Sequence, residues 1–164
     1  MKKRILPLLA GIWPYLLVGV FLYIYLVRPS ADGPVSQVPV FTAGCILLLA
    51  PIVSLVCLLW GMKAQVSSPA LLANWCLAVK LAHIPFYLLI FFLFMFLPVF
   101  GVFLFVFDAM ALIVSSGFGI AAILRSRREG LLTNGQTVLH SLAHCFFVTD
   151  VLSAFLLWRK LKNQ

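Results

Sequence analysis

Long apolar runs separated by short polar connections divide this chain into segments. Residues 5–27 carry no formal charge and, as a helix rising about 1.5 Å per residue, would extend about 34 Å. That length exceeds the roughly 30 Å hydrocarbon core of a bilayer. A second apolar run covers residues 40–62, and the connection 28–39 is rich in Pro, Gly and Ser. The pattern predicts transmembrane helices at 5–27 and 40–62.

The next apolar stretch is too long for one span. Within residues 81–124 the only formally charged side chain is Asp108. A single helix over this stretch would be about 66 Å long, twice the thickness of the hydrocarbon core. The chain must therefore turn back, and residues 98–101, which contain Pro and Gly, suit a turn best. We predict one helix at 73–97 and another at 101–124.

A further segment, residues 136–158, is long enough to span but carries several polar side chains. His140 and His144 share one face of a helix, whereas Asp150 points elsewhere at about 100° per residue. A helix on the membrane surface needs one clean polar face, so this scatter favours a fifth span, with the C-terminus outside. The basic residues at 159–162 favour the alternative, four spans and an interfacial helix, by the positive-inside rule.

Composition excludes an ordinary soluble fold. Hydrophobic residues make up 64% of the 164 residues and charged residues only 10%. Soluble domains contain roughly 45–50% apolar residues. Such an apolar exterior would aggregate in water, but it is stable in lipid when the backbone groups are paired within helices. We predict an all-α integral membrane protein, a single polytopic domain over 1–164 built as a bundle of five transmembrane helices.

The basic residues are placed to orient the chain in a membrane. The formal net charge is +8, but Lys and Arg cluster at the ends of the apolar runs, as on the cytoplasmic side of membrane proteins. We expect a cytoplasmic N-terminus in a bacterial cytoplasmic membrane. The expected partners are the lipid bilayer and either another membrane protein or a second copy of the chain, with no nucleic acid.

A set of polar side chains lies inside the predicted helices. Ionisable groups within a bilayer are costly and usually face protein or water, so these residues are the candidates for a functional site. We expect the long side chain of one of them, Lys80, to reach the inner membrane surface. The full set is Lys80, His83, Tyr87, Asp108, His140, His144 and Asp150.

One face of the predicted helix 101–124 is lined by small residues, which let helices approach closely. The face also bears Asp108, and its small residues are Ala111, Ser115, Gly119 and Ala122. We interpret it as a helix-packing face. If the segment 136–158 packs on it, Asp108 and Asp150 lie at similar depth and are able to share one site, where they would share a proton or bind a cation.

Two histidines at 140 and 144 have the spacing that places two imidazoles on one helical face, as zinc sites require. His83 is the candidate third ligand. The pattern lacks a neighbouring glutamate and a clear third ligand, so we expect no cofactor and keep zinc as an alternative.

No stretch of the chain carries a specific catalytic motif, and we assign no catalytic residue. The short connections favour a non-enzymatic membrane subunit of a transport-accessory, sensing or immunity type, which acts through helix contacts. One alternative is a small oligomeric transporter or channel that uses Asp108 and Asp150. The other is a membrane-embedded, metal-dependent enzyme that uses His83, His140 and His144.

Overall fold

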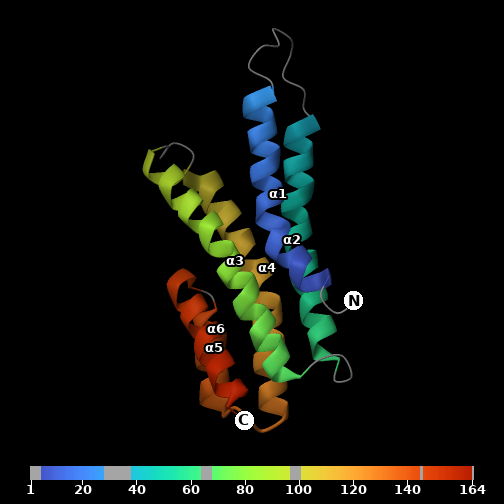
Figure 1. Cartoon of the computed structure of the whole chain (residues 1–164), viewed down its shortest axis with the longest axis vertical. Helices are drawn as coiled ribbons and strands as arrows, with labels where there is room; N and C mark the ends of the chain where they lie inside the picture. The colour runs from blue at the N-terminus through green and yellow to red at the C-terminus, as the bar shows by residue number, and fades with distance from the viewer. Residues whose placement is uncertain (1–4, 28–37, 64–67, 97–100, 145, 164) are drawn as a thin grey trace.

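The computed structural model describes residues 5–27, 38–63, 68–96, 101–144 and 146–163, and the regular elements in these ranges are all α-helices. This confirms the all-α prediction for the described residues. The helices are α1 (Ile5–Val27), α2 (Val38–Met62), α3 (Pro69–Phe96), α4 (Gly101–Arg128), α5 (Asn134–Ala143) and α6 (Phe147–Lys162). α1 and α2 form one antiparallel pair and α3 and α4 a second, while α5 and α6 form a short hairpin against α3 and α4 (Figure 1).

Three helices are long and apolar enough to cross a membrane. The segments are Phe41–Met62, Pro69–Phe96 and Phe105–Arg128. α1 is also apolar, with 23 residues and no acidic or basic side chain. The outward faces carry large apolar side chains; Phe41, for example, is 75% exposed. Such surfaces are stable against lipid and would aggregate in water, so the helices indicate a membrane location.

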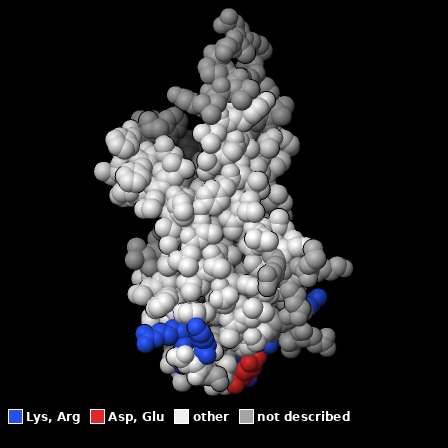
Figure 2. Space-filling model, viewed as in Figure 1, with Lys and Arg blue, Asp and Glu red and all other residues white. Residues whose placement is uncertain are grey.

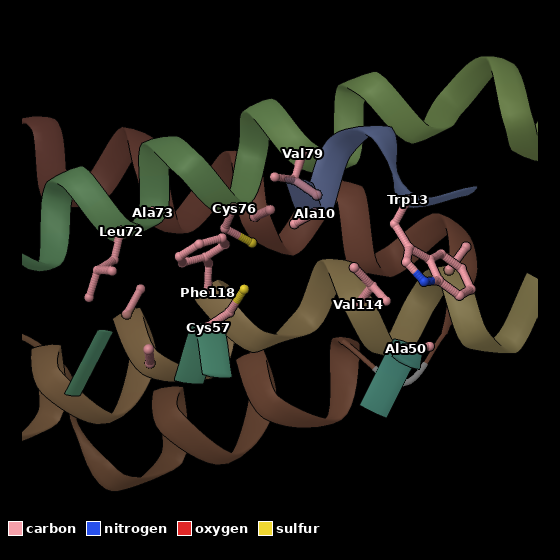
Figure 3. Packing of buried hydrophobic residues seen from close by; sticks show 14 of the residues in the cluster. Ala10, Trp13, Ala50, Cys57, Leu72, Ala73, Cys76, Val79, Val114 and Phe118 are labelled. Carbon is pink, nitrogen blue, oxygen red and sulfur yellow. The ribbon is translucent and has the colours of Figure 1, made fainter. Parts of the chain in front are cut away.

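α4 lies at the centre of the bundle and contacts each of the other five helices. The small residues of its predicted packing face are buried: Ala111, Ser115, Gly119 and Ala122. Phe118 is fully buried next to them and packs with apolar residues from α3 (Figure 3). Small side chains shorten the distance between helix axes, which is why one helix is able to contact so many neighbours.

α2 approaches α4 closely at Gly117. A Cβ atom built at this glycine would lie 2.5 Å from the backbone oxygen of Ser54 and 3.0 Å from Cβ of Cys57. A backbone oxygen cannot move away from this clash by a side-chain rotation, so only glycine fits at position 117. Gly117 was not part of the predicted packing face, because the approach of α2 cannot be read from the α4 sequence alone.

The expectation of a single helix over residues 136–158 is wrong. The chain forms α5 and α6 there, with His144 as the C-cap of α5 and Phe146 as the N-cap of α6. At the break the Thr149 hydroxyl donates to the carbonyl oxygen of Ala143 at 3.0 Å, which satisfies a helix-end acceptor. With 10 and 16 residues, the helices extend about 15 and 24 Å, less than the roughly 30 Å core.

The hairpin returns the C-terminus to the end of the bundle where α4 ends (Figure 1). Lys160 Nζ near the end of α6 donates to Gln136 Oε1 near the start of α5 at 2.7 Å. This differs from the expected placement of the C-terminus on the opposite side. Figure 2 shows the Lys and Arg side chains of the visible face in the lower part of the molecule, near this end.

Candidate functional site

Asp150 on α6 is the centre of a buried network of polar side chains. Lys80 Nζ on α3 donates to its Oδ2 atom, and His144 Nδ1 at the end of α5 bonds to its Oδ1 atom. Lys80 Nζ also donates to Ser115 Oγ on α4 at 3.4 Å. Lys80, Asp150 and His144 are only 0%, 1% and 3% exposed. We call these four residues the buried charge network; it joins the hairpin to α3 and α4.

The charges within the network are balanced. His144 lies on the hairpin, outside the long helices, and burial lowers its pKa although the bond to Asp150 opposes that shift. Burial therefore favours the neutral imidazole. Its bond to a carboxylate assigns the proton to Nδ1 and leaves Nε2 unprotonated. Lys80 and Asp150 then form an ammonium–carboxylate pair of zero net charge.

The His144 ring packs closely against Gly119 on α4. A Cβ atom at position 119 would lie 2.7 Å from His144 Nε2 and 2.9 Å from Sγ of Cys76 on α3. The imidazole and the thiol therefore occupy the space that a side chain would need. This gives the small-residue face of α4 a second role, because it admits the polar hairpin as well as apolar helices.

Lys80 does not reach the membrane surface as its long side chain led us to expect. It is fully buried, and Asp150 holds its ammonium group within the bundle. Where little water is present, an opposite charge attracts an ammonium group much more strongly than it does in water. The sequence cannot show this partner, because Asp150 reaches Lys80 only through the hairpin break.

His83 lies outside the network and satisfies a backbone group on another helix. Its Nε2 atom is 2.9 Å from the carbonyl oxygen of Ala10 on α1. Pro14 stands four residues after Ala10 within α1 and has no N–H group, so the carbonyl of Ala10 loses its usual helical donor. His83 replaces that donor. The sequence shows both a histidine and a proline within apolar helices. Only the packing of α3 on α1 shows that His83 bonds to the carbonyl that Pro14 leaves without a donor.

His140 bonds within the hairpin. Its Nδ1 atom is 2.7 Å from Oγ of Ser153 on α6, and burial, followed by the nearby His144 and Lys160, lowers its pKa. The three histidines considered as zinc ligands thus have three different bonding partners. In the part of the chain that the structure describes, no three His, Cys, Asp or Glu side chains gather as a metal site.

Asp108 occupies different surroundings from Asp150. It lines a groove of about 1100 Å³ between α3, α4 and α6. Its Oδ1 atom is buried and has no hydrogen-bond partner among the described residues. The Tyr87 side chain is near enough to interact electrostatically with both carboxylates, and its hydroxyl approaches the Ser115 side chain. The two aspartates predicted to share one site are therefore divided between the groove and the buried charge network.

The described residues define a helical protein in which three helices are able to cross a membrane. The chain belongs to the family of unknown function DUF6652, whose model matches residues 3–163. No curated protein and no solved structure matches the chain.

Proposed function

We propose that this chain is a non-enzymatic, multi-pass membrane subunit that acts through contacts between helices. The observation that carries the proposal is the closure of the buried charge network. Both carboxylate oxygens of Asp150 are bonded within the chain, and Lys80 and His144 are sealed from solvent with it. Polar groups arranged in this way hold helices together.

Catalysis would need a different arrangement of the same groups. A general acid or base must lie within hydrogen-bond reach of a substrate atom, either directly or through one water molecule. Lys80, at 0% exposed, and Asp150, at 1%, offer no such approach. A buried ion pair also recovers its desolvation cost only while both partners stay in place. The network therefore suits the docking of α5 and α6 on α3 and α4.

The proposed topology has four spanning helices, α1 to α4, and a hairpin that enters and leaves on the cytoplasmic side. It replaces the five-span arrangement. Two observations support it: each hairpin helix is shorter than the hydrocarbon core, and the hairpin ends near the end of α4 (Figure 1). Basic side chains of α4 and α6 then lie on one side, as the positive-inside rule requires.

Reporter fusions test this topology. A reporter after Gln164 should read cytoplasmic, as should one after Arg128, because the last turns of α4 and α6 are both basic. A reporter after Met62 should read the same, because Lys63 directly follows α2. A reporter inserted after Asp32 in the connection between α1 and α2 is the control and should read external. An external reading at Gln164 would restore the five-span arrangement.

Proton flux in proteoliposomes tests the proposed function against a transport role for the network. An imposed pH gradient should decay at the rate seen in protein-free liposomes, because Lys80, His144 and Asp150 are closed to water. The matched control is the double variant Lys80→Met, Asp150→Leu, which has no ionisable pair at this point. Wild-type flux that disappears in the double variant would assign the network to proton transport and overturn the proposal.

A further inference from the structure

The groove between α3, α4 and α6 has the size and lining of a ligand site. Its volume is about 1100 Å³, and it follows α3 from Leu77 to Phe94, about 25 Å along a helix. Ligand sites are typically apolar and aromatic cavities of roughly 300–1,000 Å³ with a few placed polar groups. The aromatic residues of this groove are Tyr87, Phe91, Phe94, Phe105, Phe155 and Trp158.

Asp108 gives this apolar groove an acidic group. The residue lies on the lining, and its buried Oδ1 atom has no hydrogen-bond partner in the described ranges. Buried polar atoms are nearly always hydrogen-bonded, and an ionisable group at this depth usually has a partner. Lys80 is not available to Asp108, because its ammonium group is held by Asp150 and Ser115. A partner from outside the chain would complete the site.

The chemistry of that partner follows from the lining. A carboxylate attracts a positive charge, and the faces of Trp, Tyr and Phe rings attract cations within about 6 Å of the ring centre. The remaining wall is apolar and favours a hydrophobic body. In the view of Figure 2, the exposed Lys and Arg side chains lie low on the molecule, toward the end where α4 terminates. Asp108 lies near the beginning of α4, close to the opposite end.

From these features we infer that the groove binds a hydrophobic organic cation, which enters sideways from the bilayer and pairs its charge with Asp108. The apolar body would lie along α3, against Phe91 on that helix and Phe155 on α6. This site uses neither Lys80 nor Asp150. The inference therefore adds ligand binding to the proposed function, and it holds whether or not the proposed function is correct.

Binding of tetraphenylphosphonium to the purified full-length protein in mild detergent tests the inference by equilibrium dialysis. Wild type should bind this cation, and Asp108→Asn should weaken the affinity at least tenfold because the counter-charge is lost. Asp108→Glu keeps the charge and should retain binding. Glu129→Gln is the control, since Glu129 lies in the turn after α4 and pairs with Arg125; it should bind as wild type does.

Tetraphenylborate, of similar size and opposite charge, separates charge recognition from simple apolar contact. It should bind more weakly than tetraphenylphosphonium, and Asp108→Asn should not weaken it further. The melting temperature of each variant shows whether it is folded. If Asp108→Asn unfolds, the affinities of the two probes are still compared in wild type and in Asp108→Glu. Equal binding of both probes would indicate a groove for lipid chains and overturn the inference. If wild type does not bind tetraphenylphosphonium, the inference is also overturned. That result is expected if a helix of a partner protein occupies the groove.

Discussion

Replacement of Asp150 by Leu should release α6 from the bundle and destabilise the protein by about 3–5 kcal/mol. The variant leaves the ammonium group of Lys80 in a fully buried position without its counter-charge. It also removes the acceptor of His144 Nδ1 at the hairpin break. Unfolding in detergent measures the stability. Release of α6 is measured by maleimide labelling of an added Ala154→Cys, since Ala154 is 1% exposed in the docked helix.

The double variant Lys80→Met, Asp150→Leu provides the decisive comparison. Apolar side chains of similar volume often replace a buried ion pair without loss, because neither charge then has to be desolvated. We therefore expect the double variant to recover most of the stability and to protect position 154 from labelling. The control is Glu129→Gln, which breaks a pair whose carboxylate is 43% exposed and should cost less than about 1 kcal/mol.

Two results would contradict a docking role for the ion pair. A double variant that loses as much stability as the two single variants together would show that Lys80 and Asp150 act independently. A single Asp150→Leu variant as stable as wild type would show that the network does not hold the hairpin.

Gly117→Ala should separate α2 from α4 and destabilise the protein by about 1–3 kcal/mol. The added Cβ atom would lie 2.5 Å from the backbone oxygen of Ser54. Because that oxygen belongs to the backbone, the clash is relieved only if a whole helix moves. Gly44→Ala on α2 is the matched control, because nothing lies within 4 Å of a Cβ atom at that position. Its stability should be unchanged or slightly higher, since alanine favours helices over glycine.

Thermal unfolding of both variants in the same detergent measures this difference. A loss confined to Gly117→Ala supports the close approach of α2 to α4. Equal stability of the two variants would mean that the helices do not approach each other closely at this glycine.

Apolar runs and their lengths make the long helices predictable. A bilayer admits only backbones that pair internally, and its thickness sets the number of residues needed to cross it. The sequence also selects the polar side chains that the structure brings together in the buried charge network. Lys80, His144 and Asp150 were in the candidate cluster, and Ser115 was in the packing face of α4. Residue type and position within an apolar helix suffice for this selection.

Which of these side chains bond to one another was decided by the tertiary structure. On one continuous helix His144 and Asp150, six residues apart, would point about 120° apart. The polar residues of 136–158 therefore appeared scattered, and a fifth span was predicted. After the break between α5 and α6, His144 bonds to Asp150, and Asp150 in turn binds Lys80. No local periodicity encodes that break.

The helical structure and the suitability for a membrane both follow from the apolar content of each segment, so they are predictable without the fold. Only the tertiary structure assigned His83 to the carbonyl of Ala10, Asp150 to Lys80, and Asp108 to a separate groove. The physical reason is that a buried polar atom takes the partner that packing brings within reach. That partner lies on another helix, at a distance along the chain that helical spacing cannot specify.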